Sequence, residues 1–114
     1  MKDPKARQLF DQVLQKTKDG RISWAPARTD SGFITVLPGD LALMVSKTYE
    51  PDSYGNPDEQ ISMALIGEDR ELLRVAAGET IDWPEFSELY ELARRKALGV
   101  DAKVDKLLGD LARM

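Results

Sequence analysis

Apolar and polar positions repeat along this chain with two different periods, and each period predicts one kind of element. Between residues 4 and 18 the apolar positions recur every three or four residues, which predicts an amphipathic helix. Asp3 is a good N-cap for this helix, and Pro4 suits its first turn. Gly20 can adopt a positive φ and end it.

The pattern then changes to alternation, which predicts β-strands. Apolar and β-branched residues alternate with polar ones in several short runs, and Pro38-Gly39-Asp40 is a compact turn signal between two of them. The segment 50–59 contains two prolines, a glycine and four acids, and we expect it to be a structureless connector. Five strands are therefore expected, at residues 21–25, 33–37, 41–46, 61–65 and 72–76.

Helical spacing returns in the last third of the chain. The run from Asp82 to Glu85 resembles a capping box with proline in the first turn, and Gly99 can end that helix. Asp101 can cap a last helix. The apolar residues that share one face of this last helix are Val104, Leu107, Leu108 and Leu111.

The order of these elements predicts an α+β fold in a single domain over residues 1–114. Strands joined by short turns favour an antiparallel meander, because a parallel sheet would need helical crossovers. We expect an N-terminal helix, a five-stranded meander and two C-terminal helices packed on one face of the sheet. Ile34 and Val36 alternate with Phe33 and Leu37, so the second face also carries apolar residues that association could cover.

The net charge of the chain disfavours some classes of binding partner. The formal net charge is −4, and most of the excess negative charge lies in residues 58–114. A broad nucleic-acid-binding face and binding to anionic membranes are both disfavoured. The longest aliphatic run, Leu41–Val45, is too short to span a bilayer, and the N-terminal residues do not resemble a signal peptide. We therefore expect a cytoplasmic protein.

Composition removes several kinds of chemistry. The chain has no His and no Cys, which excludes imidazole catalysis, thiolate nucleophiles and disulfides. No glycine-rich segment joins a strand to a helix, so no phosphate-binding loop is predicted. The remaining catalytic candidates are carboxylates, which mostly fall in caps, turns and polar helix faces. We expect no enzyme activity, no cofactor and no metal.

The acidic segment 50–59 has two interpretations. Its hard oxygen donors, Asp52, Asn56, Asp58 and Glu59, suit calcium or magnesium, but their spacing does not match an EF-hand loop. The alternative is a solvated connector, which we favour. Aromatic residues near it and at element ends are candidate interface residues. The predicted partner-binding set is Trp24, Tyr49, Asp52, Tyr54, Asp58, Glu59 and Trp83, and for Trp24 and Trp83 a core role is the alternative.

Two motifs suggest a family. Residues 16–24 contain Lys-Thr-x-x-Gly-x-Ile-x-Trp, and residues 89–95 read Leu-Tyr-Glu-Leu-Ala-Arg-Arg. Together they resemble a family of small, uncharacterised bacterial proteins of about this length. This resemblance implies a bacterial origin but no mechanism.

These observations favour a non-catalytic protein-interaction module, such as an immunity or adaptor protein, with a protein partner of unknown identity. Open strand edges also favour a homodimer. Two alternatives remain. One is a small-ligand or regulatory domain with a pocket between the sheet and the C-terminal helices, and the other is a carboxylate-dependent hydrolase.

Overall fold

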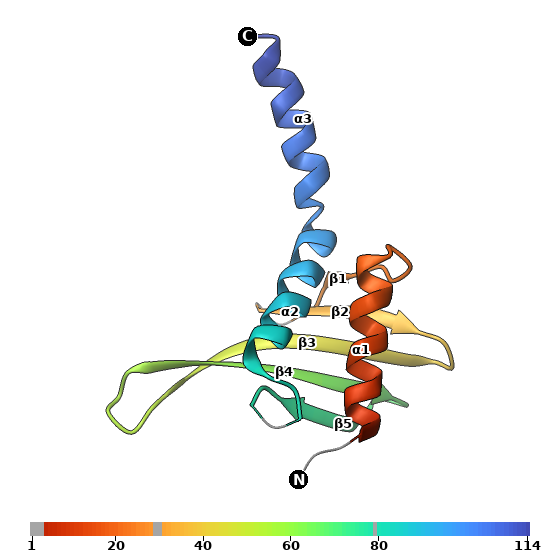
Figure 1. The fold of residues 1–114 in the computed structure, drawn as a ribbon, viewed down its shortest axis with the longest axis vertical. Helices are drawn as coiled ribbons and strands as arrows, with labels where there is room; N and C mark the ends of the chain where they lie inside the picture. Colours follow the sequence, from red (N-terminus) through yellow and green to blue (C-terminus); the bar gives the residue numbers. More distant parts are fainter. Residues whose placement is uncertain (1–3, 29–30, 79) are drawn as a thin grey trace.

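A computed structural model of the chain describes residues 4–28, 31–78 and 80–114, and it confirms the α+β fold (Figure 1). One helix precedes five strands and two helices follow them. The elements are α1 (Pro4–Lys18), β1 (Ala25–Pro26), β2 (Gly32–Leu37), β3 (Leu41–Pro51), β4 (Pro57–Gly67), β5 (Arg70–Ala76), α2 (Trp83–Leu98) and α3 (Val100–Ala112).

The five strands form one antiparallel meander, as predicted. Their spatial order is β1-β2-β3-β4-β5, so each strand pairs with its neighbours in sequence. Between β4 and β5 the turn residues Glu68 and Asp69 both have positive φ, 51° and 63°. Positive φ at both central positions gives a turn whose twist matches that of the flanking strands.

The first strand is shorter and later than predicted. It comprises Ala25 and Pro26 alone, and residues 21–24 are not in a strand. The reason is that Trp24 turns toward α1, where its indole N–H donates a hydrogen bond to the Thr17 hydroxyl at 3.1 Å. The carbonyl of Ser23 accepts a hydrogen bond from the Thr35 side chain at 2.6 Å instead of joining a ladder.

The prediction of a structureless connector over residues 50–59 is wrong. The strands β3 and β4 pair continuously from Leu41 with Gly67 to Pro51 with Pro57, so that only residues 52–56 connect them. The Asp52 carboxylate accepts hydrogen bonds from the backbone N–H groups of Tyr54 and Asn56, at 2.8 and 2.9 Å. This Asx-type turn closes the hairpin, and the two prolines lie at the end of the ladder, where a missing donor costs little.

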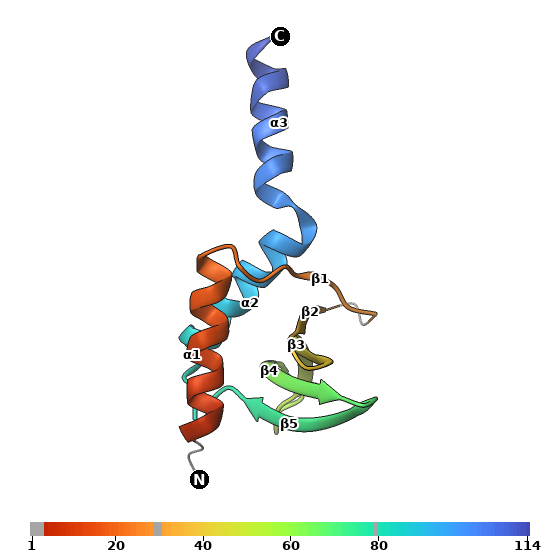
Figure 2. The same cartoon turned by 90° about the vertical axis from the view of Figure 1, so that its right-hand side faces the viewer.

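The helices α1 and α2 cover one face of the sheet and leave the other face uncovered (Figure 2). Side chains that alternate inward along β2 to β5 pack against both helices. The buried apolar core comprises Ala6, Phe10, Val13, Trp24, Phe33, Leu43, Val45, Ile61, Met63, Val75, Ile81, Phe86, Leu89, Tyr90 and Ala93.

Ring packing and ion pairs join the helices α1 and α2, which come from opposite ends of the chain, and the Lys18–Glu88 pair at 3.0 Å is one of them. The rings of Phe10 and Phe86 pack with centroids 5.2 Å apart, and both side chains are fully buried. At the edge of this contact Arg7 donates two hydrogen bonds to Glu85, at 2.6 and 2.7 Å. Glu85 also accepts a hydrogen bond from the Asp82 backbone N–H at 3.4 Å, so the predicted capping box is present.

The predicted packing of the C-terminal helices on the sheet holds for α2 and not for α3. The helix α3 leaves the domain after Gly99, and none of its residues is buried (Figures 1 and 2). Within the described residues, the close backbone contacts of α3 are with α2.

Replacing Phe86 with alanine should lower the free energy of unfolding by about 3–5 kcal/mol, because it leaves a cavity between α1 and α2. Chemical denaturation measures this change. The control is Val36→Ala, at a side chain that is 82% exposed, which should change the free energy by about 0.5 kcal/mol or less. Equal effects of the two substitutions would contradict this account of the core.

The ion pair between Arg7 and Glu85 makes the free energy of unfolding depend on pH in the acidic range. The hydrogen bonds from Arg7 hold the pKa of Glu85 below its ordinary value of 4.5. Protonation of Glu85 therefore favours the unfolded chain. The contribution of the Arg7–Glu85 ion pair to the free energy of unfolding is fully present above pH 4.5, and it is lost as the pH falls through the lower pKa of the folded state. Glu85→Gln should flatten the acid limb of the free energy of unfolding against pH. Glu91→Gln, on the same helix, is the control and should keep the wild-type slope.

Candidate binding surfaces

The helix α3 carries an apolar stripe that is exposed along most of its length, with Val100 at its start partly buried. Val100, Val104, Leu107 and Leu111 follow one another at intervals of four, three and four residues, which places them along one side of the helix. We call these four residues the α3 seam. Val104, Leu107 and Leu111 are 43%, 55% and 52% exposed, and Leu108 beside them is 59% exposed.

The path of the chain at Gly99 explains why the α3 seam is free. Gly99 has φ 61° and ψ 36°, so it ends α2 in the left-handed conformation and starts α3 in a new direction. Asp101 was predicted to cap α3, but Gly99 occupies that position and Asp101 lies in the first turn. The Asp101 carboxylate instead accepts a hydrogen bond from Arg95, which ties the two helices together.

The uncovered face of the sheet is a second apolar surface. Side chains that alternate with the core residues of β2, β3 and β4 lie on it, among them Ile34, Val36, Ala42, Met44 and Ile66. Val36 is largely exposed and the other four are partly exposed. This surface matches the second apolar face that the alternation in the sequence predicts.

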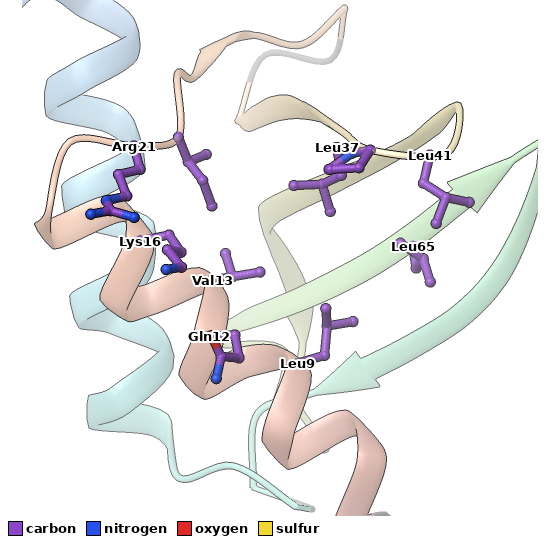
Figure 3. A pocket seen from close by; sticks show the side chains of 10 residues that line it. Leu9, Gln12, Val13, Lys16, Arg21, Leu37, Leu41 and Leu65 are labelled. Atoms are coloured by element: carbon purple, nitrogen blue, oxygen red, sulfur yellow. The ribbon is translucent and has the colours of Figure 1, made fainter.

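A groove between α1 and the sheet is the third feature. Leu9 and Val13 of α1 line one side of it, and Leu37, Leu41 and Leu65 of the sheet line the other (Figure 3). Its volume is about 520 Å³. The pocket expected for a small-ligand domain lies between the sheet and the C-terminal helices, whereas this groove lies under the N-terminal helix.

The cations Lys16 and Arg21 border this groove near the C-terminal end of α1 (Figure 3). Among the residues described, neither side chain forms an ion pair. The groove therefore combines apolar walls with positive charge at one end.

The predicted partner-binding residues do not form one cluster. Tyr49 and Tyr54 are 63% and 89% exposed. Trp83 begins α2 and is 40% exposed. The five predicted residues that share the far end of the β3–β4 hairpin are Tyr49, Asp52, Tyr54, Asp58 and Glu59.

Trp24 belongs to the core. It is 6% exposed, and its indole N–H is satisfied by Thr17, so it offers little surface to a partner. The core role, which the sequence left as the alternative, is the one that the geometry supports. The physical reason is that the large indole ring is buried in the core cluster and its N–H group is satisfied by Thr17 of α1.

A charged contact fixes the inner part of the hairpin. The Lys47 ammonium lies 2.6 Å from the Glu59 carboxylate and 4.6 Å from the centroid of the Tyr90 ring. Partial burial acts to lower the pKa of Lys47, but the hydrogen bond and charge of Glu59 outweigh it, so the net shift is upward. Burial raises the pKa of the Tyr90 hydroxyl, which donates a hydrogen bond to the Ser31 carbonyl at 3.2 Å. Glu59 is thus engaged within the fold.

The acids of the hairpin do not gather around a common point. In the described part of the chain, no three acidic side chains lie together in a way that could hold a metal ion. Asp52 directs one of its oxygens to the backbone of its own turn. Over the same residues, no helix is long and apolar enough to cross a bilayer.

Comparison with known proteins gives no match to a protein-family model, to a curated protein or to a solved structure. The family resemblance of the two sequence motifs therefore stays a prediction. Several residues of these motifs have structural roles here. Trp24 donates a hydrogen bond to Thr17. The buried residues of the second motif are Leu89, Tyr90 and Ala93.

The sequence predicts the apolar stripe on α3, but the predicted packing of this helix on the sheet is wrong. The signal that could have distinguished packing on the sheet from pairing with another helix is the narrow width of the stripe. Its apolar residues recur singly at intervals of three or four, and Leu108 is the one apolar residue beside them. A helix that packs on a sheet usually presents a wider face. The narrow spacing is typical of a helix that pairs with another helix.

Proposed function

We propose that this chain is a non-catalytic protein-interaction module, in the manner of an immunity or adaptor protein, and that it binds its partner through the α3 seam. The observation that carries the proposal is the exposure of this stripe on a helix that projects from an otherwise complete domain. Contiguous apolar surface of this kind is typical of interaction sites in proteins that do not aggregate.

The energetics of α3 support a partner. The helix has 13 residues, and isolated helices shorter than about 12–15 residues are marginal in water. Gly109 lies within it, and glycine in a helix interior costs about 1 kcal/mol relative to alanine. Burial of a leucine side chain contributes about 1.5–3 kcal/mol, so a partner on the seam would stabilise both the helix and the complex.

Covalent cross-linking in the cells that naturally make the protein tests this proposal. A tagged copy carrying Leu107→Ser and Leu111→Ser should lose its cross-linked protein partner, whether that partner is another copy of the chain or a different protein. The matched control carries Ala102→Ser and Lys106→Ser on the opposite side of α3 and should retain the partner. Cross-links that are identical in the two variants would contradict a role for the seam.

Binding of a small ligand is a second candidate function, and the groove under α1 supports it. Its apolar walls and the bordering charges of Lys16 and Arg21 suit an aliphatic chain with an anionic head. The apolar part would replace water along Leu9, Leu37 and Leu65, and the head would meet the cations.

Titration with a medium-chain fatty acid and with the alcohol of equal length tests this second function. The acid should bind more tightly than the alcohol. Lys16→Glu combined with Arg21→Glu should weaken the acid about tenfold and leave the alcohol unchanged, because two charge contacts are lost. Leu9→Trp should block both ligands by filling the groove, whereas the control Val36→Trp, on the uncovered sheet face, should block neither. Failure of the acid to bind the wild-type protein would exclude this function.

A further inference from the structure

We infer that the occupant of the α3 seam is a second copy of this chain, with the two α3 helices paired antiparallel. The inference rests on the proposed function, because it names the partner of the same surface. The intervals of four, three and four between Val100, Val104, Leu107 and Leu111 are those of a coiled-coil core. A stripe of this kind is completed by another helix with the same spacing, and a second copy supplies one.

The charges beside the seam determine how two copies align. Lys103 directly precedes Val104, and Asp110 directly precedes Leu111, so both charges lie on the same flank of the seam. Among the described residues neither side chain forms an ion pair within the chain. In an antiparallel pair this flank of one helix faces the same flank of the other.

One antiparallel register pairs the apolar residues of the α3 seam with one another and also pairs Lys103 with Asp110. When Val104 lies opposite Leu107 of the second copy, Val100 lies opposite Leu111, and each of these pairs occurs twice by symmetry. In this register Lys103 lies opposite Asp110 of the second copy, and Asp110 lies opposite its Lys103. The two-fold arrangement therefore gives two pairs of opposite charge and a continuous apolar core.

The other alignments of the two helices bring like charges together or leave a charge without a partner. A shift of one heptad in either direction brings Lys103 opposite Lys103, or Asp110 opposite Asp110, of the second copy. A parallel pair brings Lys103 opposite Leu108 of the second copy, which leaves the charge without a partner. Like charges and unpaired charges discriminate against these alignments.

The open strand edges, which also favour a homodimer on sequence grounds, fit a second copy less well. The outer edge of β5 carries Arg70, Glu71 and Arg74, and all three are exposed. Charged side chains on an edge strand oppose pairing with another sheet. At the other end of the sheet, β1 ends at Pro26, which lacks a backbone donor.

Sedimentation equilibrium of purified charge variants tests the pairing. The wild-type chain should be in equilibrium between monomer and dimer. Leu107→Ser removes two core leucines from each dimer and should weaken association about a hundredfold or more, whereas Ala102→Ser should have no effect. Lys103→Asp and Asp110→Lys should each weaken association about tenfold, because each places like charges in both flanking pairs.

Restoring opposite charges in the flanking pairs tests the register more directly than the single variants do. The double variant Lys103→Asp/Asp110→Lys should regain the wild-type association, and an equal mixture of the two single variants should form heterodimers. Circular dichroism should give the same thermal transition of the core for every variant, because none of these residues lies in the core. Loss of association without rescue by the double variant would overturn the antiparallel register.

The absence of native cysteine allows a test of distance. Chains with Val100→Cys mixed with chains with Leu111→Cys should form a disulfide between them on oxidation. Leu111→Cys alone should not, because in this register the two copies of residue 111 lie about 16 Å apart along the helix axis, beyond the roughly 7 Å that a disulfide spans. The opposite result would indicate a parallel pair and overturn the inference.

The outcomes separate this inference from the function on which it rests. A chain that is monomeric at every concentration, but whose seam still captures a different protein, overturns the homodimer and leaves the interaction module standing. A chain whose seam variants change neither self-association nor cross-linking overturns both.

Discussion

The packing of Phe10 against Phe86 determines how the rest of the molecule is organised. A five-stranded sheet of this size must bury one face, and the chain meets this requirement with one helix from each end. The two rings, 5.2 Å apart, and the double hydrogen bond from Arg7 to Glu85 hold α1 and α2 together over the sheet. The helices α1 and α2 occupy that face, and at Gly99 the chain turns so that α3 projects away from it.

Much of this fold could be predicted from periodicity. The helix limits at Pro4–Lys18 and Trp83–Leu98, the order of the strands and the left-handed Gly99 agree with local signals in the sequence. The failures have a common cause, which is that local propensity was outweighed by longer-range contacts. Two prolines and several acids suggested a loop over residues 50–59, yet pairing along β3 and β4 carries the strands to both prolines. Trp24 suggested a strand, yet its hydrogen bond to Thr17 draws it out of the sheet.

The candidate surface could be predicted only in part. An apolar stripe on Val104, Leu107 and Leu111 has the same pattern whether the helix packs on its own domain or on another chain. The direction of α3 decides between these two cases, and it depends on the conformation of Gly99, which the sequence permits but does not require. The hairpin residues show the reverse problem. Tyr49 and Tyr54 are exposed, as an interface requires, but Glu59 is engaged by Lys47 inside the fold.

The separation of α3 from the core has a consequence for how this chain can change in evolution. The residues that stabilise the domain and the residues of the seam belong to different sets, and they meet at the single αL position of Gly99. On the proposed function, substitutions in α3 alter recognition without a cost in core packing, and substitutions in the core leave the recognition surface unchanged.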